Sequence, residues 1–258
     1  MLVAIDIGNT NILIGMIDPN GSILSQHRIS TVDFLDENQA SKNIFLDLIK
    51  KFNPIIDYDF TIASVVPEVL EKIKSILLEN HISPNILNST DQILGMKIDI
   101  DKPSELGTDR IINAIAANNE YDVPLIVIDF GTATTFDIID SSGTYKGGLI
   151  CPGIKLSIKS LNVETAQLPL IKLKRTSKVV GRDTNSAIES GIYWGYVSLV
   201  EGLIDKIKNE MNFNNCTVIG TGGLSHIFKE DIKKINYFND ELTLKGLYLI
   251  NNKINEKK

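Results

Sequence analysis

Two segments of this sequence place an aspartate, a glycine and a cluster of hydroxyl or amide side chains directly after an apolar run. The first is Asp6-Ile7-Gly8-Asn9-Thr10-Asn11, and the second is Asp129-Phe130-Gly131-Thr132-Ala133-Thr134-Thr135. Such turns can direct backbone N–H groups and a threonine hydroxyl at phosphate oxygens, while the carboxylate holds Mg²⁺ directly or through water. One Asp-x-Gly turn is a weak signal because hairpins use these residues for geometry alone. Two copies favour a phosphate site.

A third glycine-rich segment, Gly220-Thr221-Gly222-Gly223-Leu224-Ser225, follows the apolar run 216–219. It predicts another turn with exposed backbone after a strand. The sequence contains neither a Walker A motif nor a GxGxxG motif, so the P-loop and dinucleotide-binding classes have no support.

The elements around these turns repeat along the chain. Each Asp-x-Gly segment lies between two β-rich runs, and each second run ends in a glycine-containing turn, at 18–21 and at 140–143. Helical patterns over 67–79, 108–118 and 184–211 alternate with further strands, which predicts an α/β fold with two similar lobes. We expect an N-terminal lobe over residues 1–120 and a C-terminal lobe over 121–258. Thr108 and Thr184 are each expected to cap their helix.

The helix expected over 184–211 carries Ala187, Gly191 and Gly195 at every fourth position. Glycine inside a helix costs about 1 kcal/mol relative to alanine, so two glycines on one stripe indicate the close approach of another element. Packing inside the subunit and packing across a homodimer interface both explain such a stripe.

Composition excludes several classes of protein. The 258 residues carry a formal net charge of −6 with a pI near 5.2, which argues against a nucleic-acid partner. No apolar run approaches the roughly 20 residues of a membrane span, and Asp6 interrupts the N-terminal apolar stretch. Two cysteines are too few for a disulfide framework, so a reducing, cytoplasmic location is expected.

The combination of motifs is more specific than any one of them. Together the motifs resemble type III pantothenate kinase, the first enzyme of coenzyme A synthesis in many bacteria, and they occur in the family's order over nearly the whole chain: Asp6-Ile7-Gly8-Asn9-Thr10, Gly107-Thr108-Asp109-Arg110, Asp129-x-Gly131-Thr132-Ala133-Thr134-Thr135, Gly147-Gly148-x-x-x-Pro152-Gly153, Gly181-Arg182-Asp183-Thr184 and Thr221-Gly222-Gly223. The resemblance implies two ribonuclease-H-like lobes of the actin-like ATPase superfamily, with the nucleotide cleft between them.

The resemblance also implies a set of nucleotide and cation contacts. ATP would contact Thr132 and the first segment, namely Asp6, Ile7, Gly8, Asn9, Thr10, Asn11, Ile12 and Leu13. Asp6 would hold Mg²⁺, most simply through water. Asp129 would help to hold a monovalent cation, K⁺ or NH₄⁺.

For the acceptor, the resemblance implies that Gly107, Thr108, Asp109 and Arg110 bind pantothenate and that Asp109 is the catalytic carboxylate. Phosphoryl transfer passes through a loose transition state, so an ordinary carboxylate can orient the hydroxyl and accept its proton late. We hypothesise that Arg110 contacts the pantothenate carboxylate. Thr184 would contact pantothenate from the partner subunit of a homodimer. Ile100 stands where many members carry an aromatic residue.

Two alternative functions remain open at this stage. A kinase for another small hydroxylated metabolite could use the same scaffold, because a fold does not fix the acceptor. A non-catalytic accessory factor could retain the fold alone. The intact carboxylates Asp6, Asp109 and Asp129 favour the catalytic reading.

Overall fold

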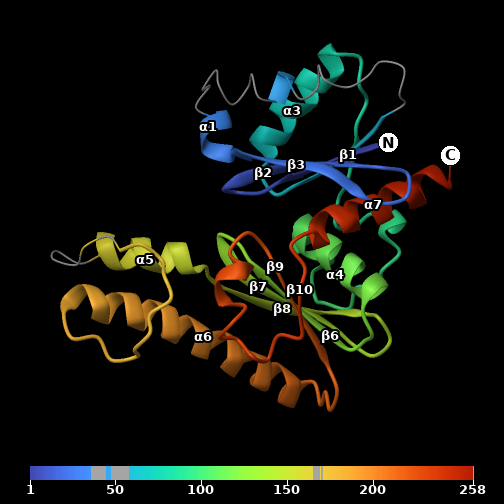
Figure 1. The fold of residues 1–258 in the computed structure, drawn as a ribbon. Coiled ribbons are helices and arrows are strands. Elements are labelled where there is room, and N and C mark those ends of the chain that lie inside the picture. Colours follow the sequence, from blue (N-terminus) through green and yellow to red (C-terminus); the bar gives the residue numbers. More distant parts are fainter. Residues whose placement is uncertain (36–44, 48–57, 165–168, 170, 258) are drawn as a thin grey trace. The chain divides into compact units, whose positions relative to one another are not determined.

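The structure is a computed structural model of the chain, and it describes residues 1–35, 45–47, 58–164, 169 and 171–257. The chain forms two compact units, whose elements are labelled in Figure 1. Unit 1 contains residues 1–96, 101–116 and 241–258, and unit 2 contains residues 97–100 and 117–240. The sequence analysis predicted a boundary between the two lobes near residue 120, and the units of the structure differ from that prediction in one main respect. The last eighteen residues pack with the N-terminal part of the chain, because their apolar face is buried there.

Unit 1 is built on a five-stranded sheet. Its strands are β1(Leu2–Ile7), β2(Asn11–Ile17), β3(Ile23–Ser30), β4(Asp59–Ser64) and β5(Asn85–Ile86). The order across the sheet is β3-β2-β1-β4-β5, in which β1, β2 and β3 are antiparallel neighbours and β4 and β5 run parallel to β1. The carboxyl ends of β1, β4 and β5 therefore meet at one edge of the sheet.

Unit 2 repeats this sheet strand for strand. It contains β6(Leu125–Phe130), β7(Ala133–Ile139), β8(Tyr145–Pro152), β9(Thr217–Thr221) and β10(Tyr237–Phe238). The order is β10-β9-β6-β7-β8, with β6–β7 and β7–β8 antiparallel and β9 and β10 parallel to β6. The predicted duplication and the two-lobed α/β fold are confirmed.

The duplication extends to the turns that close the hairpins. Gly21 donates its backbone N–H to the Asp18 carbonyl at 3.0 Å, and Gly143 donates to the Asp140 carbonyl at 2.9 Å. Both glycines have positive φ angles, 88° and 76°, which residues with a Cβ rarely adopt. Hence both turns need glycine at the same place.

The helices fall near the expected positions, and their bounds are α1(Thr31–Leu35), α3(Pro67–Glu79), α4(Thr108–Glu120), α5(Ile154–Val163), α6(Thr184–Glu210) and α7(Leu242–Asn255). Single 3₁₀ turns occur at Gln92–Leu94, Pro103–Glu105 and Ser225–Phe228. No helix among these described elements is long and apolar enough to cross a bilayer.

Both predicted helix caps are wrong by one residue. Thr108 is the first residue of α4 and follows Gly107, and Thr184 is the first residue of α6. The cap of α6 is Asp183, whose carboxylate accepts a hydrogen bond from the Ser186 N–H at 2.9 Å. Aspartate caps a helix as well as threonine does, and Asp183 has the extended backbone that a cap requires.

Helices cover both faces of the first sheet. In Figure 1, α1 and α3 lie on one face of the β1–β3 region and α7 lies on the other. On the α7 face the buried Thr61 hydroxyl donates to the Asn251 carboxamide at 2.9 Å. Leu244 of α7 packs against Gly15 of β2 so closely that an added Cβ would lie 2.7 Å from it. The C-terminal helix thus completes the core of unit 1.

Candidate active site

The first predicted phosphate-binding segment is the tight connection between β1 and β2. Gly8 donates its N–H to the Asn11 carbonyl at 3.0 Å, which closes the turn and leaves the side chains of Asn9, Thr10 and Asn11 exposed. Three members of the predicted set, Ile7, Ile12 and Leu13, have buried side chains. Any contribution of these three to a ligand therefore comes from their backbone.

Thr31, the first residue of α1, holds this turn in place through two hydrogen bonds. Its hydroxyl donates to the Gly8 carbonyl at 2.7 Å, and its N–H donates to the Thr10 carbonyl at 2.9 Å. The side chain is 1% exposed. Sequence reasoning missed Thr31 because it lies more than twenty residues from the turn and belongs to no motif.

The second predicted segment is the corresponding connection between β6 and β7 in unit 2. Gly131 donates to the Ala133 carbonyl at 3.1 Å, and Gly153, just before α5, donates to the Thr132 carbonyl at 3.1 Å. A Cβ on Gly153 would lie 2.2 Å from the Thr132 carbonyl oxygen. This contact explains why residue 153, directly after β8, is a glycine. It leaves the Thr132 side chain exposed.

Asp129, near the end of β6, lies against the third glycine-rich turn. Gly222 has a φ of 90°, and a Cβ there would lie 2.2 Å from Asp129 Oδ1. Leu224, after the turn, donates to the Phe130 carbonyl at 3.3 Å. The glycine therefore lets backbone approach the carboxylate closely. Carboxylate and backbone oxygens together suit a hard cation.

Tyr196 of α6 supports the same region of unit 2. Its hydroxyl is hydrogen-bonded to the hydroxyl of Thr134, the second residue of β7. Burial, reinforced by the nearby negative charge of Asp129, raises the pKa of Tyr196 to about 12. Tyr196 therefore stays protonated near neutral pH.

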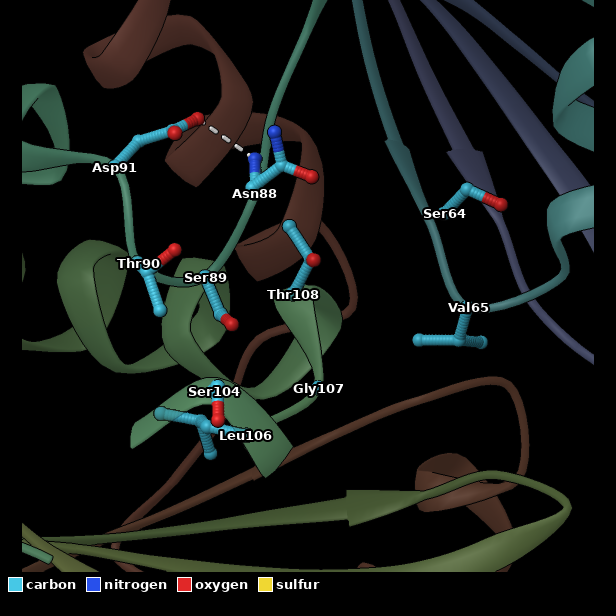
Figure 2. Close-up of a pocket in the computed structure, with 10 residues that line it drawn as sticks. All are labelled: Ser64, Val65, Asn88, Ser89, Thr90, Asp91, Ser104, Leu106, Gly107 and Thr108. Atoms are coloured by element: carbon cyan, nitrogen blue, oxygen red, sulfur yellow. Dashed lines mark hydrogen bonds between the residues drawn. The ribbon is translucent and has the colours of Figure 1, made fainter. Parts of the chain in front are cut away.

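A pocket of about 420 Å³ lies within unit 1 (Figure 2). Its lining consists of Ser64, Val65, Asn88, Ser89, Thr90, Asp91, Ser104, Leu106, Gly107 and Thr108. Parallel α/β sheets bind ligands at the carboxyl ends of their strands, and Ser64 stands at that end of β4. Val65 also donates its N–H to the Ile7 carbonyl at 3.0 Å, so the pocket adjoins the end of β1.

The predicted pantothenate segment meets this pocket at the start of α4. Gly107 and Thr108 line it, whereas Asp109 and Arg110 are half-buried beside it in the first turn of the helix. The Asp109 Oδ1 atom accepts a hydrogen bond from the Arg110 N–H at 2.8 Å. Burial raises the pKa of the Asp109 carboxyl above its ordinary value, although the hydrogen bond from Arg110 opposes the shift.

The structure brings most of the predicted site residues together in two places, one in each unit. Residues 6–13 and 107–110 share the carboxyl edge of the first sheet, while Asp129 and Thr132 share the β6–β7 turn. Thr184 is the first residue of α6 in unit 2, and its side chain is exposed. Within the described residues, no cluster of three His, Cys, Asp or Glu side chains could hold a metal alone. A Mg²⁺ ion at Asp6 would therefore need further oxygen ligands, such as phosphates.

The glycine stripe of α6 is exposed. Ala187, Gly191 and Gly195 are all solvent-exposed, and a Cβ added at either glycine would meet no described atom within 4 Å. Packing inside the subunit therefore does not explain the two glycines within the described part of the chain, whereas the backbone of Ala187 does lie against Gly181, where an added Cβ would be 2.3 Å from the Ala187 nitrogen.

The fold itself has relatives among solved structures. A Campylobacter jejuni protein described as a conserved Baf family transcriptional activator superposes with a TM-score of 0.61 at 19% identity, covering 98% of this chain and 99% of that one. The polyphosphate/ATP-glucomannokinase of Arthrobacter sp. strain KM superposes with a TM-score of 0.50 at 14% identity, covering 99% and 98%. At these identities the likeness concerns the fold alone, the two-lobed fold of sugar kinases and actin-like ATPases.

Sequence relatives are more specific. A family model described as type III pantothenate kinase matches residues 2–206. The type III pantothenate kinase of Paramagnetospirillum magneticum is 41% identical over 251 residues, covering 96% of this chain and 95% of that protein. With this match and the site geometry in agreement, the chain belongs to the type III pantothenate kinase family.

Proposed function

We propose that the protein transfers the γ-phosphoryl group of ATP to the primary hydroxyl of pantothenate, forming 4'-phosphopantothenate in the first step of coenzyme A biosynthesis. The observation that carries this proposal is the Gly107–Arg110 segment, which borders a pocket at the carboxyl edge of the first sheet in a chain that matches the family over its length.

Asp109 is the residue we assign to the acceptor hydroxyl. Its Oδ1 atom is held by the Arg110 N–H, which fixes the rotation of the carboxylate and turns Oδ2 toward the acceptor in this proposal. A carboxylate with a raised pKa is a better proton acceptor than an ordinary one. Because the transition state is loose, the carboxylate mainly orients the hydroxyl and takes its proton late.

The two Asp-x-Gly turns are the proposed contacts for the ATP phosphates. Their exposed side chains and backbone N–H groups, at Asn9–Asn11 and at Thr132, have the donor chemistry that phosphate oxygens require. Asp6 is the proposed ligand of Mg²⁺, directly or through water. When bound, Mg²⁺ neutralises charge that develops on the phosphate oxygens.

Asp129 is the proposed ligand of a monovalent cation, K⁺ or NH₄⁺. The close approach of the Gly222 backbone to its carboxylate supports this assignment, because a side chain at Gly222 would fill the space beside Oδ1. Asp129 would hold the cation next to the Thr132 turn. Replacing K⁺ by Na⁺, which is smaller, should therefore weaken activity.

We further propose that the protein acts as a homodimer through α6. Support comes from the exposed stripe of Ala187, Gly191 and Gly195 and from Leu199 on the same helix, which is 39% exposed. Thr184 begins this helix, so in a dimer it would be available to the partner's pantothenate site. Small residues let two helices approach closely, which suits a helix-to-helix interface.

A coupled assay of ADP release tests the proposed reaction. ATP and Mg²⁺ are supplied with K⁺ or Na⁺, and pantothenate is present, absent or replaced by simple sugars. We expect turnover that requires pantothenate and falls when Na⁺ replaces K⁺. Turnover with a sugar alone would favour a kinase for another metabolite. ATP binding without turnover on any acceptor would favour a non-catalytic accessory role.

A further inference from the structure

The wall of the unit 1 pocket opposite the β4 end is a loop that belongs to no motif of the sequence. It runs from Asn88 to Asp91, immediately after β5, and all four of its residues line the pocket. The loop begins where Leu87 donates its N–H to the Ile62 carbonyl at 2.9 Å, so it continues directly from the sheet.

Asp91 closes this loop and fixes the position of Asn88. The Asn88 N–H donates to Asp91 Oδ2 at 2.7 Å, and the Asp91 N–H donates back to the Asn88 carbonyl at 3.0 Å. Ser89 between them is 8% exposed. Figure 2 shows the Asn88 carboxamide above Thr108, with its oxygen on the side that faces Ser64 and Val65. A side chain presented from so constrained a loop loses little entropy when it binds.

The lining of the pocket has a distinctive chemistry. Hydroxyl groups come from Ser89, Thr90, Ser104 and Thr108, and Asn88 adds a carboxamide. Among the described residues that line the pocket, the one charged side chain is the Asp91 carboxylate, and none is lysine or arginine. Next to the loop, a carboxylate ligand would face the like charge of Asp91, whereas Arg110, the cation that we assign to the acceptor carboxylate, lies beside the pocket and outside this lining. The neutral hydroxyl and amide groups of a ligand would find both hydrogen-bond donors and acceptors in this lining.

Pantothenate carries both kinds of group. Its carboxylate is at one end, whereas an amide and a secondary hydroxyl lie between that end and the primary hydroxyl that receives the phosphoryl group. We propose that Asn88 is a specificity-determining residue that hydrogen-bonds the neutral hydroxyl-and-amide part of the acceptor, with the acceptor carboxylate held elsewhere. This assignment rests on the proposed pantothenate kinase function.

The test uses the full-length protein and two ligands, pantothenate and pantothenyl alcohol, in which a hydroxymethyl group replaces the carboxylate. Calorimetry gives the affinity of each ligand for the wild type, for Asn88→Ala and for the control Gln92→Ala. Gln92 is exposed next to the same loop but is absent from the pocket lining. We expect Asn88→Ala to weaken both ligands by a similar factor, about tenfold for a lost hydrogen bond that leaves its partner unpaired. ATP affinity and the control variant should be unchanged.

Three results would overturn the proposal. A loss confined to pantothenate would mean that Asn88 holds the carboxylate. Unchanged affinities would mean no contact. If Asn88→Ala lost affinity for ATP and for pantothenate equally and also had a lower melting temperature, Asn88 would have a structural role. If Asn88→Ala fails to fold, Asn88→Leu, which is neutral and similar in size, replaces it and should weaken pantothenate and the alcohol alike.

The same experiment separates this proposal from the proposed function. Wild-type turnover with pantothenate is measured first and concerns the reaction alone. Turnover that is normal in the wild type, combined with an unaffected Asn88→Ala variant, rejects only the role of Asn88. Absence of pantothenate binding in the wild type rejects the acceptor before any variant is compared.

Discussion

Asp109 is held in a position that suits its proposed role and does not favour folding. It occupies the first turn of α4, where a negative charge interacts favourably with the helix dipole, yet burial raises the pKa of its carboxyl. A group that is harder to ionise in the folded state than in the unfolded state makes the folded protein less stable once it is ionised.

We predict that Asp109→Asn removes activity and increases stability. The loss in kcat should be about a hundredfold or more, the usual contribution of a general base. The melting temperature at pH 7 should rise, because the amide needs no ionisation. Activity is measured by ADP release, with binding of pantothenate as the control for an intact pocket. A variant that turns over at the wild-type rate would remove Asp109 from the mechanism.

The pH dependence of stability gives a second prediction about the same carboxyl. Its folded pKa lies above its unfolded pKa, so its stabilising contribution is complete below the unfolded value and is lost as the pH rises through the folded value. The stability advantage of Asp109→Asn over the wild type should therefore shrink as the pH falls toward the ordinary aspartate pKa. Urea unfolding of both proteins at several acidic pH values measures this. An advantage that grows on acidification would contradict the raised pKa.

At the scale of elements, the second phosphate turn depends on the start of α5. Gly153 touches the carbonyl oxygens of Gly131 and Thr132, and an added Cβ would lie 2.7 Å and 2.2 Å from them. Backbone atoms on both sides leave no flexible side chain that could move aside. The β6–β7 turn must therefore shift if residue 153 has a side chain.

We predict that Gly153→Ala weakens ATP more than pantothenate. Displacing Thr132 affects the proposed phosphate contact in unit 2, whereas the pocket of unit 1 is unchanged. Affinities for the two ligands, measured separately by calorimetry, should differ in their response by at least about tenfold, as a lost charge-assisted hydrogen bond implies. Gly202→Ala is the matched control, because its Cβ meets no described atom within 4 Å and the glycine is not one of the residues of the proposed stripe. Equal weakening of both ligands would exclude a local effect at the turn.

The elements that the sequence predicted well are those with a local signature. The hairpins could be predicted because Asp18-Gly21 and Asp140-Gly143 have the turn chemistry that their backbone needs. The cap of α6 was misplaced by one residue because Asp183 and Thr184 are adjacent and both cap helices well.

The features that escaped prediction depend on distant contacts. The packing of α7 rests on the Thr61–Asn251 hydrogen bond, whose partners are 190 residues apart. The pocket loop Asn88–Asp91 has no glycine or proline to mark it, and its function as a wall follows from the position of β5 beside β4. Motif spacing singled out Gly107–Arg110, which borders the pocket, but could not identify the residues on the opposite side.

At the scale of the whole molecule, the glycines of α6 link stability to assembly. A Cβ added at Gly195 would meet no atom of the described residues within 4 Å, so these residues set no steric obstacle to a side chain there. Replacing a helical glycine by a better helix former contributes up to about 1 kcal/mol to the stability of the helix. In a dimer in which α6 packs closely against the partner's α6, the same side chain would keep the two helices apart.

We predict that Gly195→Leu gives a folded monomer. Sedimentation should show half the mass of the wild-type dimer, while circular dichroism shows unchanged helix content. Pantothenate affinity should fall if Thr184 acts on the partner's site, and ATP affinity should hold. Gly195→Ala, with a smaller side chain, should show a weaker effect. A Gly195→Leu protein of wild-type mass would place the interface elsewhere.

The division of the chain between units also has a consequence for its synthesis on the ribosome. Proteins commonly fold from the N-terminus as domains emerge. Here residues 241–258 belong to unit 1, so all of unit 2 is translated before unit 1 receives its last helix. Until then the Thr61 side of the first sheet lacks its cover, and β1 and β4 expose apolar surface in the nascent chain. The second half of the gene therefore produces the first unit able to fold, and the N-terminal sheet is the part most exposed to chaperones during translation.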